Sequence, residues 1–371
     1  MGSAAATGAV PVDGLAVSVY RIPTDVPAES DGTYTWDSTT LVLVEAKAGG
    51  VAGIGYTYAD TSTARLIADM LTRVVCGMDV MSTPAIWTAL VSAIRNLGRP
   101  GIASMAISAV DVAMWDLKAR LLDVPLVSLL GASRDAVPVY GSGGFTSYSN
   151  DQLRAQLSGW VETGIPRVKM KIGRDAKSDL ERVAVARQAI GDAAELFVDA
   201  NGGYGRKQAL TQAQRFVEWR VSWFEEPVYH GDLDGLRFCR EHAPATMEIS
   251  VGEYGYEPSM FAAIVDAGAA DVLQADATRC EGITGLLIVD ALCEAKAMPL
   301  STHCAPSLHA HPACAAKRVR HVEYFHDHAR IEHMLFDGAL TPVEGALHPD
   351  LTRSGLGLEL KRADARRYEI S

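Results

Sequence analysis

The stretch RVKMKIG, residues 167–173, alternates apolar and basic residues in the manner of a β-strand. Lys169 and Lys171 stand two positions apart, so in strand geometry both side chains leave the same face. Taken alone, such a pair is most simply a strand face in contact with water. Whether the two lysines instead line a site depends on what the neighbouring segments form.

From about residue 131 onward, short strand-like runs alternate with helix-like segments. The strand-like runs are VPVYGS, RVKMKI, ELFVDAN, SWFEEP, TMEISVGE, DVLQAD, PLSTH and HVEYF. Helical patterns such as SDLERVAVARQAIG and GITGLLIVDALCEAKA separate them. This βαβα succession predicts an α/β fold, a modified (β/α)8 barrel of the TIM type with a (β/α)7β arrangement, over residues 131–340.

Residues 1–130 have a different pattern and predict an α+β unit. LAVSVYRI and TTLVLVEAKAG have the composition of strands, and GIASMAISAVDVAMWDLKARLL has apolar residues at helical intervals. The polar segment PTDVPAESDGTYTWD joins the two strands, and a connection of that length in a compact protein is often a lid. We expect the Gly- and Pro-punctuated tail, residues 341–371, to pack back on this first unit or on the barrel.

Composition and charge argue against several classes of protein. The chain has 371 residues, 48% of them hydrophobic, with a formal net charge of −11 and no stripe of Lys and Arg, which argues against nucleic acid as a partner. No long uninterrupted apolar run occurs, and the opening MGSAAATGAVPV lacks a basic start, so we expect a cytoplasmic protein without membrane contact. The six cysteines form no C-x-x-C pair, which argues against a disulfide framework or a zinc ribbon.

Titratable residues stand at the ends of successive predicted strands. Each one alone could be a helix cap or a solvated loop residue. In a barrel, however, the C-terminal ends of the strands converge on one mouth, where the chemistry takes place, so together they indicate a site that the two lysines line. From the second strand to the eighth they are Lys169 and Lys171, then Asp199, Glu225, Glu253, Asp276, His303 and Glu323.

Asp199, Glu225 and Glu253 offer three oxygen ligands on adjacent strands, a set that suits a hard cation such as Mg²⁺. Zinc would normally require His or Cys. The HAH pair, His309 and His311, resembles a zinc motif but lies in a helix-like stretch, so we expect it to be structural.

Two acid/base groups flank the predicted cation. A lysine beside a divalent cation and partly buried has its pKa lowered, and it can then act as a general base near neutral pH. Across the mouth, Asp276 can orient His303 and fix its tautomer. The sequence thus predicts proton transfer from two sides of one metal-held substrate.

These residues resemble the enolase superfamily over almost the whole chain. The motifs are VKMKIG, VDANGGY, WFEEPV, SVGE, DVLQAD, STH and VEYF, and AISAVDVAMWDLKAR is similar to the helix of the family's capping domain. The lysine pair with the Asp276 and His303 dyad resembles the mandelate racemase-like members. Muconate cycloisomerase-like members place a lysine on the sixth strand, where QADATRCEG has none. Glucarate dehydratase-like members have Asn as the third metal ligand, where this chain has Glu253, so neither of these groups fits.

The resemblance implies a residue-by-residue mechanism. Mg²⁺ held by the three carboxylates binds a substrate carboxylate, and a base removes the proton α to it to give an enediolate. Lys171 would be the base on one face, with Lys169 an electrostatic helper. His303 with Asp276 would serve the other face, Glu323 would hydrogen-bond the substrate carboxylate, and Asn201 would support the metal shell. Relatives of this architecture also lead us to expect a homo-oligomer.

The fate of the enediolate selects the reaction. We favour loss of water from an acid sugar to give a 2-keto-3-deoxy sugar acid, a hydro-lyase reaction, because this is the commonest activity in the resembling subgroup and the lid segment is polar. Racemisation or epimerisation of a 2-hydroxy acid, and cycloisomerisation of a sugar lactone, would use the same residues. The identity of the abstracting base and of the acid sugar stays open. Asn201, Tyr140, His230 and Tyr254 are candidates for binding the substrate.

Two readings from other classes compete. A barrel of this kind could be a non-catalytic binding protein, but no member of the set of strand-end residues is missing. A zinc hydrolase barrel would carry H-x-H on its first strand, and VPVYGSGG offers no histidine. Metal analysis separates these readings, because bound zinc without magnesium dependence counts against enolisation.

Overall fold

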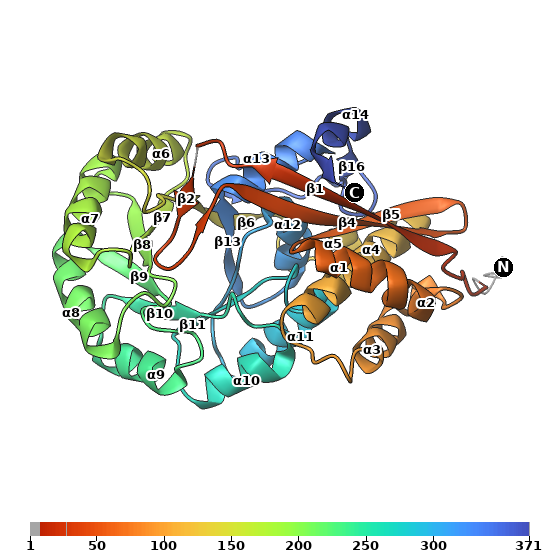
Figure 1. The fold of residues 1–371 in the computed structure, drawn as a ribbon, viewed down its shortest axis with the longest axis horizontal. Coiled ribbons are helices and arrows are strands. Elements are labelled where there is room, and N and C mark those ends of the chain that lie inside the picture. Colours follow the sequence, from red (N-terminus) through yellow and green to blue (C-terminus); the bar gives the residue numbers. More distant parts are fainter. Residues whose placement is uncertain (1–7, 27, 371) are drawn as a thin grey trace.

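The computed structural model describes residues 8–26 and 28–370, and it shows a closed barrel with an α+β unit packed beside it (Figure 1). Residues 1–7, 27 and 371 lie outside this description. The expectations for the opening segment, and for one position of the segment between the first two strands, fall partly on them. The division of the chain at residues 130 and 340 stays a prediction.

Eight parallel strands form the barrel, and pairing of β13 with β6 closes it, so the predicted barrel fold is confirmed. A short antiparallel strand, β15 (Ala346–Leu347), extends the edge of β6. The barrel strands, in chain order and in spatial order, are β6 (Val137–Gly143), β7 (Arg167–Lys171), β8 (Glu195–Asp199), β9 (Val221–Glu225), β10 (Glu248–Val251), β11 (Val272–Ala275), β12 (Leu300–Thr302) and β13 (Val319–Phe325).

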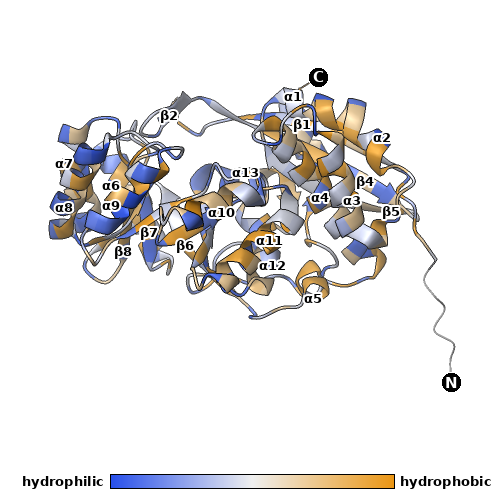
Figure 2. Ribbon diagram, turned by 90° about the horizontal axis from the view of Figure 1, so that it is seen from below, coloured by the Kyte–Doolittle hydropathy of each residue, from blue (hydrophilic) through white to orange (hydrophobic). Residues whose placement is uncertain are grey.

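Helices surround the barrel, and α8 (Arg206–Phe216) shows how one apolar face packs inward. In α8, the buried residues Ala209, Gln212, Ala213 and Phe216 follow the helical period, and the remaining positions are mostly charged or polar. Figure 2 shows this mixture of hydrophilic and hydrophobic residues along the outer helices. They are α6 (Asn150–Glu162), α7 (Ala176–Ile190), α8 (Arg206–Phe216), η3 (Val217–Trp219), α9 (Leu233–His242), α10 (Pro258–Asp266), α11 (Gly282–Ala295), α12 (Pro306–Ala315) and α13 (His326–Leu335).

The first unit is a sheet of three long strands covered by helices. Helix α4 (Ile102–Leu121) packs closely against β5, since a Cβ atom at Gly55 would lie 2.3 Å from the Ala109 carbonyl oxygen. The long strands are β1 (Gly14–Pro23), β4 (Ser38–Ala48) and β5 (Val51–Tyr58). The other helical segments are α1 (Thr61–Leu66), η1 (Ile67–Leu71), α2 (Thr72–Val75), η2 (Val80–Ser82), α3 (Thr83–Ala93) and α5 (Leu126–Leu130).

The end of the chain returns to the first unit. Strand β17 (Glu369–Ile370) pairs antiparallel with β1 and becomes the edge of that sheet. The elements before it are β14 (Phe336–Asp337), β16 (Glu359–Leu360), α14 (Arg362–Ala365) and η4 (Arg366–Tyr368).

The segment between β1 and β4 reaches from the first unit over the barrel (Figure 1) and is called the lid below, residues 24–37. It contains a two-stranded hairpin of β2 (Glu29–Ser30) and β3 (Thr35–Trp36). The Trp36 indole nitrogen donates a hydrogen bond to Asp327, at 3.2 Å, and the Ser30 and Thr146 hydroxyl groups lie 2.6 Å apart. These contacts join the lid to the start of α13 (His326–Leu335) and to the loop after β6.

Among the described helices, none combines the length and the apolar character that crossing a bilayer requires.

Candidate active site

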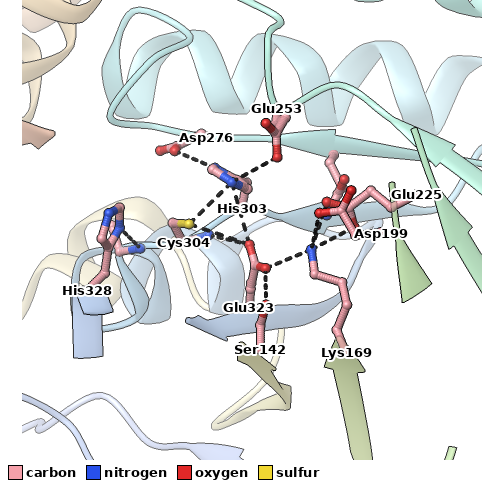
Figure 3. A network of polar contacts seen from close by, with 12 residues as sticks. Ser142, Lys169, Asp199, Glu225, Glu253, Asp276, His303, Cys304, Glu323 and His328 are labelled. Atoms are coloured by element: carbon pink, nitrogen blue, oxygen red, sulfur yellow. Dashed lines mark hydrogen bonds and ion pairs between the residues drawn. The ribbon is translucent and has the colours of Figure 1, made fainter. Parts of the chain in front are cut away.

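The eight strand-end residues that the sequence singled out meet at the mouth of the barrel. Lys171, Asp199 and Glu225 are the last residues of β7, β8 and β9, while Asp276 and His303 directly follow β11 and β12. All eight side chains are buried, with exposed fractions between 0% and 5%. Figure 3 shows most of them pointing toward one another from separate strands.

Glu253 reaches the mouth through an unusual backbone turn. It lies two residues beyond β10, after Gly252, whose φ is 141°. A Cβ atom at this glycine would lie 2.1 Å from the carbonyl oxygen of Gln274 on the neighbouring strand. The close approach of the two backbones explains why glycine precedes the glutamate here.

The carboxylates of Asp199, Glu225 and Glu253 form a compact cluster. One oxygen atom from each lies within 4.8 Å of the others, and all three residues are buried. The main-chain N–H of Asn201 donates to Asp199 at 2.9 Å and helps to orient it. Because the cluster offers only oxygen donors and concentrates negative charge, it fits a hard divalent cation.

The two lysines are held by these carboxylates. Lys169 Nζ lies 2.7 Å from Glu225 and 2.7 Å from Glu323, and Lys171 Nζ lies 2.5 Å from Asp199. Burial disfavours both ammonium groups, but the neighbouring carboxylates outweigh it and raise the pKa of each lysine above its ordinary value. The lowered lysine pKa expected from the sequence is therefore not produced by the protein's own groups, and the charge of a cation would have to supply it.

His303 and Asp276 form a hydrogen-bonded pair. His303 Nδ1 donates to Asp276 Oδ2 at 2.9 Å, which leaves Nε2 facing the mouth (Figure 3). Thr278 donates to the other oxygen of Asp276 through its main-chain N–H and its hydroxyl, both at 2.7 Å. Burial disfavours the imidazolium, but the surrounding Cys304, Glu253 and Glu323 raise the pKa of His303 well above its usual value.

Glu323 connects the two sides of the mouth. Its Oε1 accepts from Ser142 at 2.6 Å and faces Lys169, and its Oε2 accepts from the main-chain N–H of Cys304 at 3.0 Å. Burial opposes its ionisation, but the charge of Lys169 lowers its pKa below the ordinary value. Glu323 is thus a fixed carboxylate between the lysine pair and the histidine.

A pocket of about 440 Å³ opens above these groups, between the barrel and the lid. Its floor includes Lys171, Glu253 and His303, so both proposed acid/base groups face the same space. Polar and aromatic side chains share the walls. From the lid and the first unit the lining residues are Asp31, Tyr34, Trp36, Ser38, Thr39, Thr40, Tyr58, Ala59 and Asp60, and from the barrel loops Asn201, Tyr254, Arg279, Phe325, Asp327 and His328.

The structure separates the four candidate substrate contacts. Asn201 and Tyr254 line the pocket above the carboxylates. His230 lines a different, smaller cavity of about 160 Å³ beside α10, which Tyr254 also borders. Tyr140 is fully buried in the barrel interior against Phe197, where its hydroxyl accepts from Gln274 at 3.1 Å. Its strand position indicated the inward face but not its depth along the barrel.

His309 and His311 are both buried in α12. His309 Nε2 accepts from the main-chain N–H of Ala277 at 2.8 Å, and its Nδ1 lies 2.8 Å from the Cys304 carbonyl oxygen. Through these two contacts His309 links the loop that carries Asp276 to the turn after β12, which is the structural role expected from the sequence.

The sequence interpretation missed four residues of the site. Cys304 and His328 line the pocket, as does Arg279, whose guanidinium donates to the Glu253 carbonyl oxygen at 3.0 Å. Glu226, next to Glu225, is fully buried, and neither of its carboxylate oxygens has a hydrogen-bond partner. Sequence signals existed for three of them: Cys304 follows His303, Glu226 follows Glu225, and Arg279 lies three residues after Asp276. None of these signals shows whether the side chain points into the pocket.

The barrel, the unit beside it and the acidic mouth define a barrel enzyme whose site lies between two units. Residues 17–131 match the mandelate racemase / muconate lactonizing enzyme N-terminal domain, and residues 152–365 match the enolase C-terminal domain-like family. The chain therefore belongs to the enolase superfamily, in its mandelate racemase-like group, as the motifs indicated.

Two relatives of named activity are about 30% identical in sequence to this chain. An L-talarate/galactarate dehydratase of Salmonella typhimurium is 31% identical and covers 88% of this chain and 82% of its own. A 3,6-anhydro-alpha-L-galactonate cycloisomerase of Streptomyces coelicolor is 30% identical and covers 95% and 98%.

Solved structures agree with this placement. A mandelate racemase/muconate lactonizing enzyme-like protein from Rubrobacter xylanophilus is 53% identical, with a TM-score of 0.95 over 97% of this chain and 100% of its own. A racemase from Streptomyces coelicolor with bound magnesium is 28% identical, with a TM-score of 0.91 over 97% and 100%. Magnesium in a relative of the same fold, together with the oxygen-only cluster here, confirms Mg²⁺ as the cofactor predicted from the sequence.

Proposed function

We propose that this enzyme removes the proton α to the carboxylate of an acid sugar and then eliminates water to give a 2-keto-3-deoxy sugar acid. The observation that carries the proposal is the placement of Lys171 and His303 in one pocket, at opposite ends of the carboxylate cluster. Lys171 contacts Asp199 at one end, and His303 Nε2 lies 3.2 Å from Glu253 at the other.

Asp199, Glu225 and Glu253 hold the cofactor in this proposal. Mg²⁺ bound there supplies positive charge beside the substrate carboxylate, so that the second negative charge of an enediolate is stabilised. Lys169, fixed between Glu225 and Glu323, adds a second positive charge on the same side. Because these groups are already in place, little reorganisation is needed as charge develops.

The proton steps fall to the two flanking groups. Lys171, once a cation offsets its carboxylate neighbours, takes the α-proton through Nζ. The protonated His303 gives its Nε2 proton to the β-hydroxyl, which leaves as water. Asp276 keeps His303 in the tautomer and orientation that this transfer needs. The reverse assignment, with His303 as the base, suits a substrate of the opposite configuration.

The pocket walls support a hydrophilic substrate. Hydroxyl and carboxylate side chains of the lid and the first unit face the pocket, while Arg279 and Asn201 provide donors from the barrel. These polar groups suit the hydroxyl groups of a sugar acid, while Trp36 and Phe325 give the same pocket apolar surface. Two relatives act on sugar acids or their derivatives according to their names, which is consistent with this choice.

A second candidate reaction follows from the same geometry. Two acid/base groups on opposite sides of one carbon also permit the proton to return from the other face, which is racemisation or epimerisation. A D-galactarolactone cycloisomerase of Agrobacterium fabrum, 31% identical over 70% of this chain and 69% of its own, supports cycloisomerisation of a sugar lactone as a further variant. Cytoplasmic location and a homo-oligomeric state stay predictions.

The test is a screen of mono- and diacid sugars with Mg²⁺ in deuterated buffer, following keto product and α-deuterium together. Keto product from one acid supports dehydration and identifies the substrate. Deuterium incorporation without keto product moves the assignment to the racemase or epimerase. Absence of both signals across a broad library contradicts the proposal.

A further inference from the structure

A second set of metal-binding atoms lies beside the carboxylate cluster and differs from it in chemistry. His303 Nε2, Cys304 Sγ and Glu323 Oε2 converge at the end of β12 and β13 (Figure 3). The three side chains are buried, with exposed fractions of 5%, 3% and 1%. None of the steps proposed above uses the sulfur atom.

The backbone brings the thiol into this position. Cys304 and Ala305 both have positive φ values, 54° and 40°, at the turn from β12 into α12. This sharp turn folds Sγ back toward the imidazole of the preceding residue, so that two neighbours in sequence present ligand atoms to the same point. The main-chain N–H of Cys304 also holds Glu323 Oε2 in place, at 3.0 Å.

The spacing of the three atoms is that of a tetrahedral site. A zinc ion with bonds of about 2.0–2.3 Å keeps its ligand atoms roughly 3.3–3.6 Å apart. Here Nε2 and Sγ are separated by 3.2 Å, Sγ and Oε2 by 3.5 Å, and Nε2 and Oε2 by 3.7 Å. All three separations agree to within a few tenths of an ångström, so only small side-chain shifts are needed to admit the ion.

The surroundings complete the pattern. His303 donates its other ring nitrogen to Asp276, which is the arrangement that orients histidine ligands in zinc sites. Thiolate, carboxylate and neutral imidazole carry two negative charges, which balance a doubly charged cation in a buried place. His303 and Cys304 also line the pocket, so the ion would lie at its edge.

We propose that His303, Cys304 and Glu323 bind a thiophilic divalent cation of the Zn²⁺ class, separately from the Mg²⁺ cluster. On binding, the Cys304 thiol and the protonated His303 Nε2 each release one proton to solvent, and a metal–sulfur and a metal–nitrogen bond form. The sulfur ligand gives the selectivity, because Mg²⁺ takes oxygen ligands. A further consequence, which rests on the function proposed above, is inhibition of the dehydration reaction. The bound cation occupies His303 Nε2, the nitrogen that transfers the proton.

The experiment uses Co²⁺ as a spectroscopic probe of the whole protein saturated with Mg²⁺. A thiolate bound to Co²⁺ gives a charge-transfer absorption band in the near ultraviolet, which oxygen ligands do not give. We expect a band that saturates at one Co²⁺ per chain, disappears in Cys304→Ser, and persists in the control Cys76→Ser, which alters an exposed cysteine. No band in the wild-type protein, or a band that survives in Cys304→Ser, overturns the proposal.

A second measurement needs no variant, in case Cys304→Ser does not fold. X-ray absorption of the wild-type protein loaded with one Zn²⁺ per chain, with Mg²⁺ in excess, should show one sulfur scatterer at about 2.3 Å together with nitrogen and oxygen. A shell of nitrogen and oxygen alone overturns the proposal. Neither measurement depends on turnover, so failure of the acid sugar screen leaves both outcomes interpretable.

Discussion

Asp276 Oδ2 accepts a hydrogen bond from His303 Nδ1 at 2.9 Å, although the two residues are 27 positions apart and lie on different strands. This contact decides which ring nitrogen faces the pocket and keeps the imidazole charged until it gives up a proton.

Replacing His303 by Asn should abolish dehydration while leaving the fold intact, because the proton donor to the leaving hydroxyl is gone. General acid catalysis of this kind is worth roughly 10²–10⁴-fold in rate. Steady-state assays of keto product measure the effect. Asp276→Asn should lose less activity than His303→Asn, since it alters only the orientation and the charge of the ring. A His303→Asn variant with near-normal turnover would mean that Lys171 or a water molecule does both jobs.

Replacing Glu253 by Gln should remove Mg²⁺-dependent activity and the thermal stabilisation that Mg²⁺ gives, because one of three charged ligands becomes neutral. Thermal unfolding with and without Mg²⁺ tests binding apart from turnover. The matched control is Glu241→Gln, an exposed glutamate on α9, which should respond to Mg²⁺ as the wild type does. Near-normal activity of Glu253→Gln without added metal would refute the ligand assignment.

Replacing Lys171 by Ala should slow the exchange of the α-proton with deuterium for one configuration of the substrate. The expected decrease in the exchange rate is roughly 10²–10⁴-fold. The reason is the removal of the only amine at that end of the pocket among the described lining residues. Proton NMR of substrate in deuterated buffer follows the exchange. Lys177→Ala, an exposed lysine on α7, is the control. Unchanged exchange in both variants would eliminate Lys171 as a base.

Replacing Trp36 by Phe should raise KM roughly five-fold with little change in kcat, because it removes the lid's hydrogen bond to Asp327, worth about 1 kcal/mol. The phenyl ring preserves the edge-on contact with Phe145. Tyr34→Phe, on the same hairpin, is the control for a general effect of lid substitutions. Equal changes in the two variants would show that the Trp36 hydrogen bond has no special part in holding the lid.

Replacing Glu29 by Gln should weaken the pH dependence of stability. Burial, followed by the nearby Asp327 carboxylate, raises the pKa of Glu29 from 4.5 to about 10. The folded state therefore binds this proton more tightly than the unfolded state. Its contribution is fully present below pH 4.5 and is lost as the pH rises toward 10, at a rate of up to about 1.4 kcal/mol per pH unit.

Thermal unfolding at a series of pH values from weakly acidic to alkaline measures this effect. Glu29→Gln stays neutral throughout, so it should lose less stability than the wild type as the pH rises. Glu181→Gln, an exposed glutamate on α7, should follow the wild-type curve. Parallel curves for Glu29→Gln and the wild type would show that Glu29 is ionised in the folded protein.

Much of the fold followed from local patterns. The alternation of strands and helices after residue 131 predicted the barrel, because period-2 and helical patterns are readable within a single segment. The strand-end residues were predictable as a group, since parallel strands of a barrel deliver their C-terminal ends to one mouth. The pair Lys169 and Lys171 belonged to that group through the strand period alone.

Contacts between distant segments decided the rest. The short hairpin of the lid and its bond from Trp36 to Asp327 join residues 291 positions apart, and no local pattern encodes such a pairing. Tyr140 had the strand parity of an inward residue, but its depth in the barrel depends on strand tilt and register. Cys304 was one more scattered cysteine until two positive φ values directed its sulfur toward His303.

The sequence by itself determined the eight strand-end residues of the mouth, because strand period and barrel closure place them there without knowledge of their neighbours. Only the tertiary structure decided their charge states and their partners. A pKa depends on burial and on the distance to every nearby charge, so the carboxylates that raise the pKa of Lys171, and the thiol beside His303, became visible only when separate strands met in space.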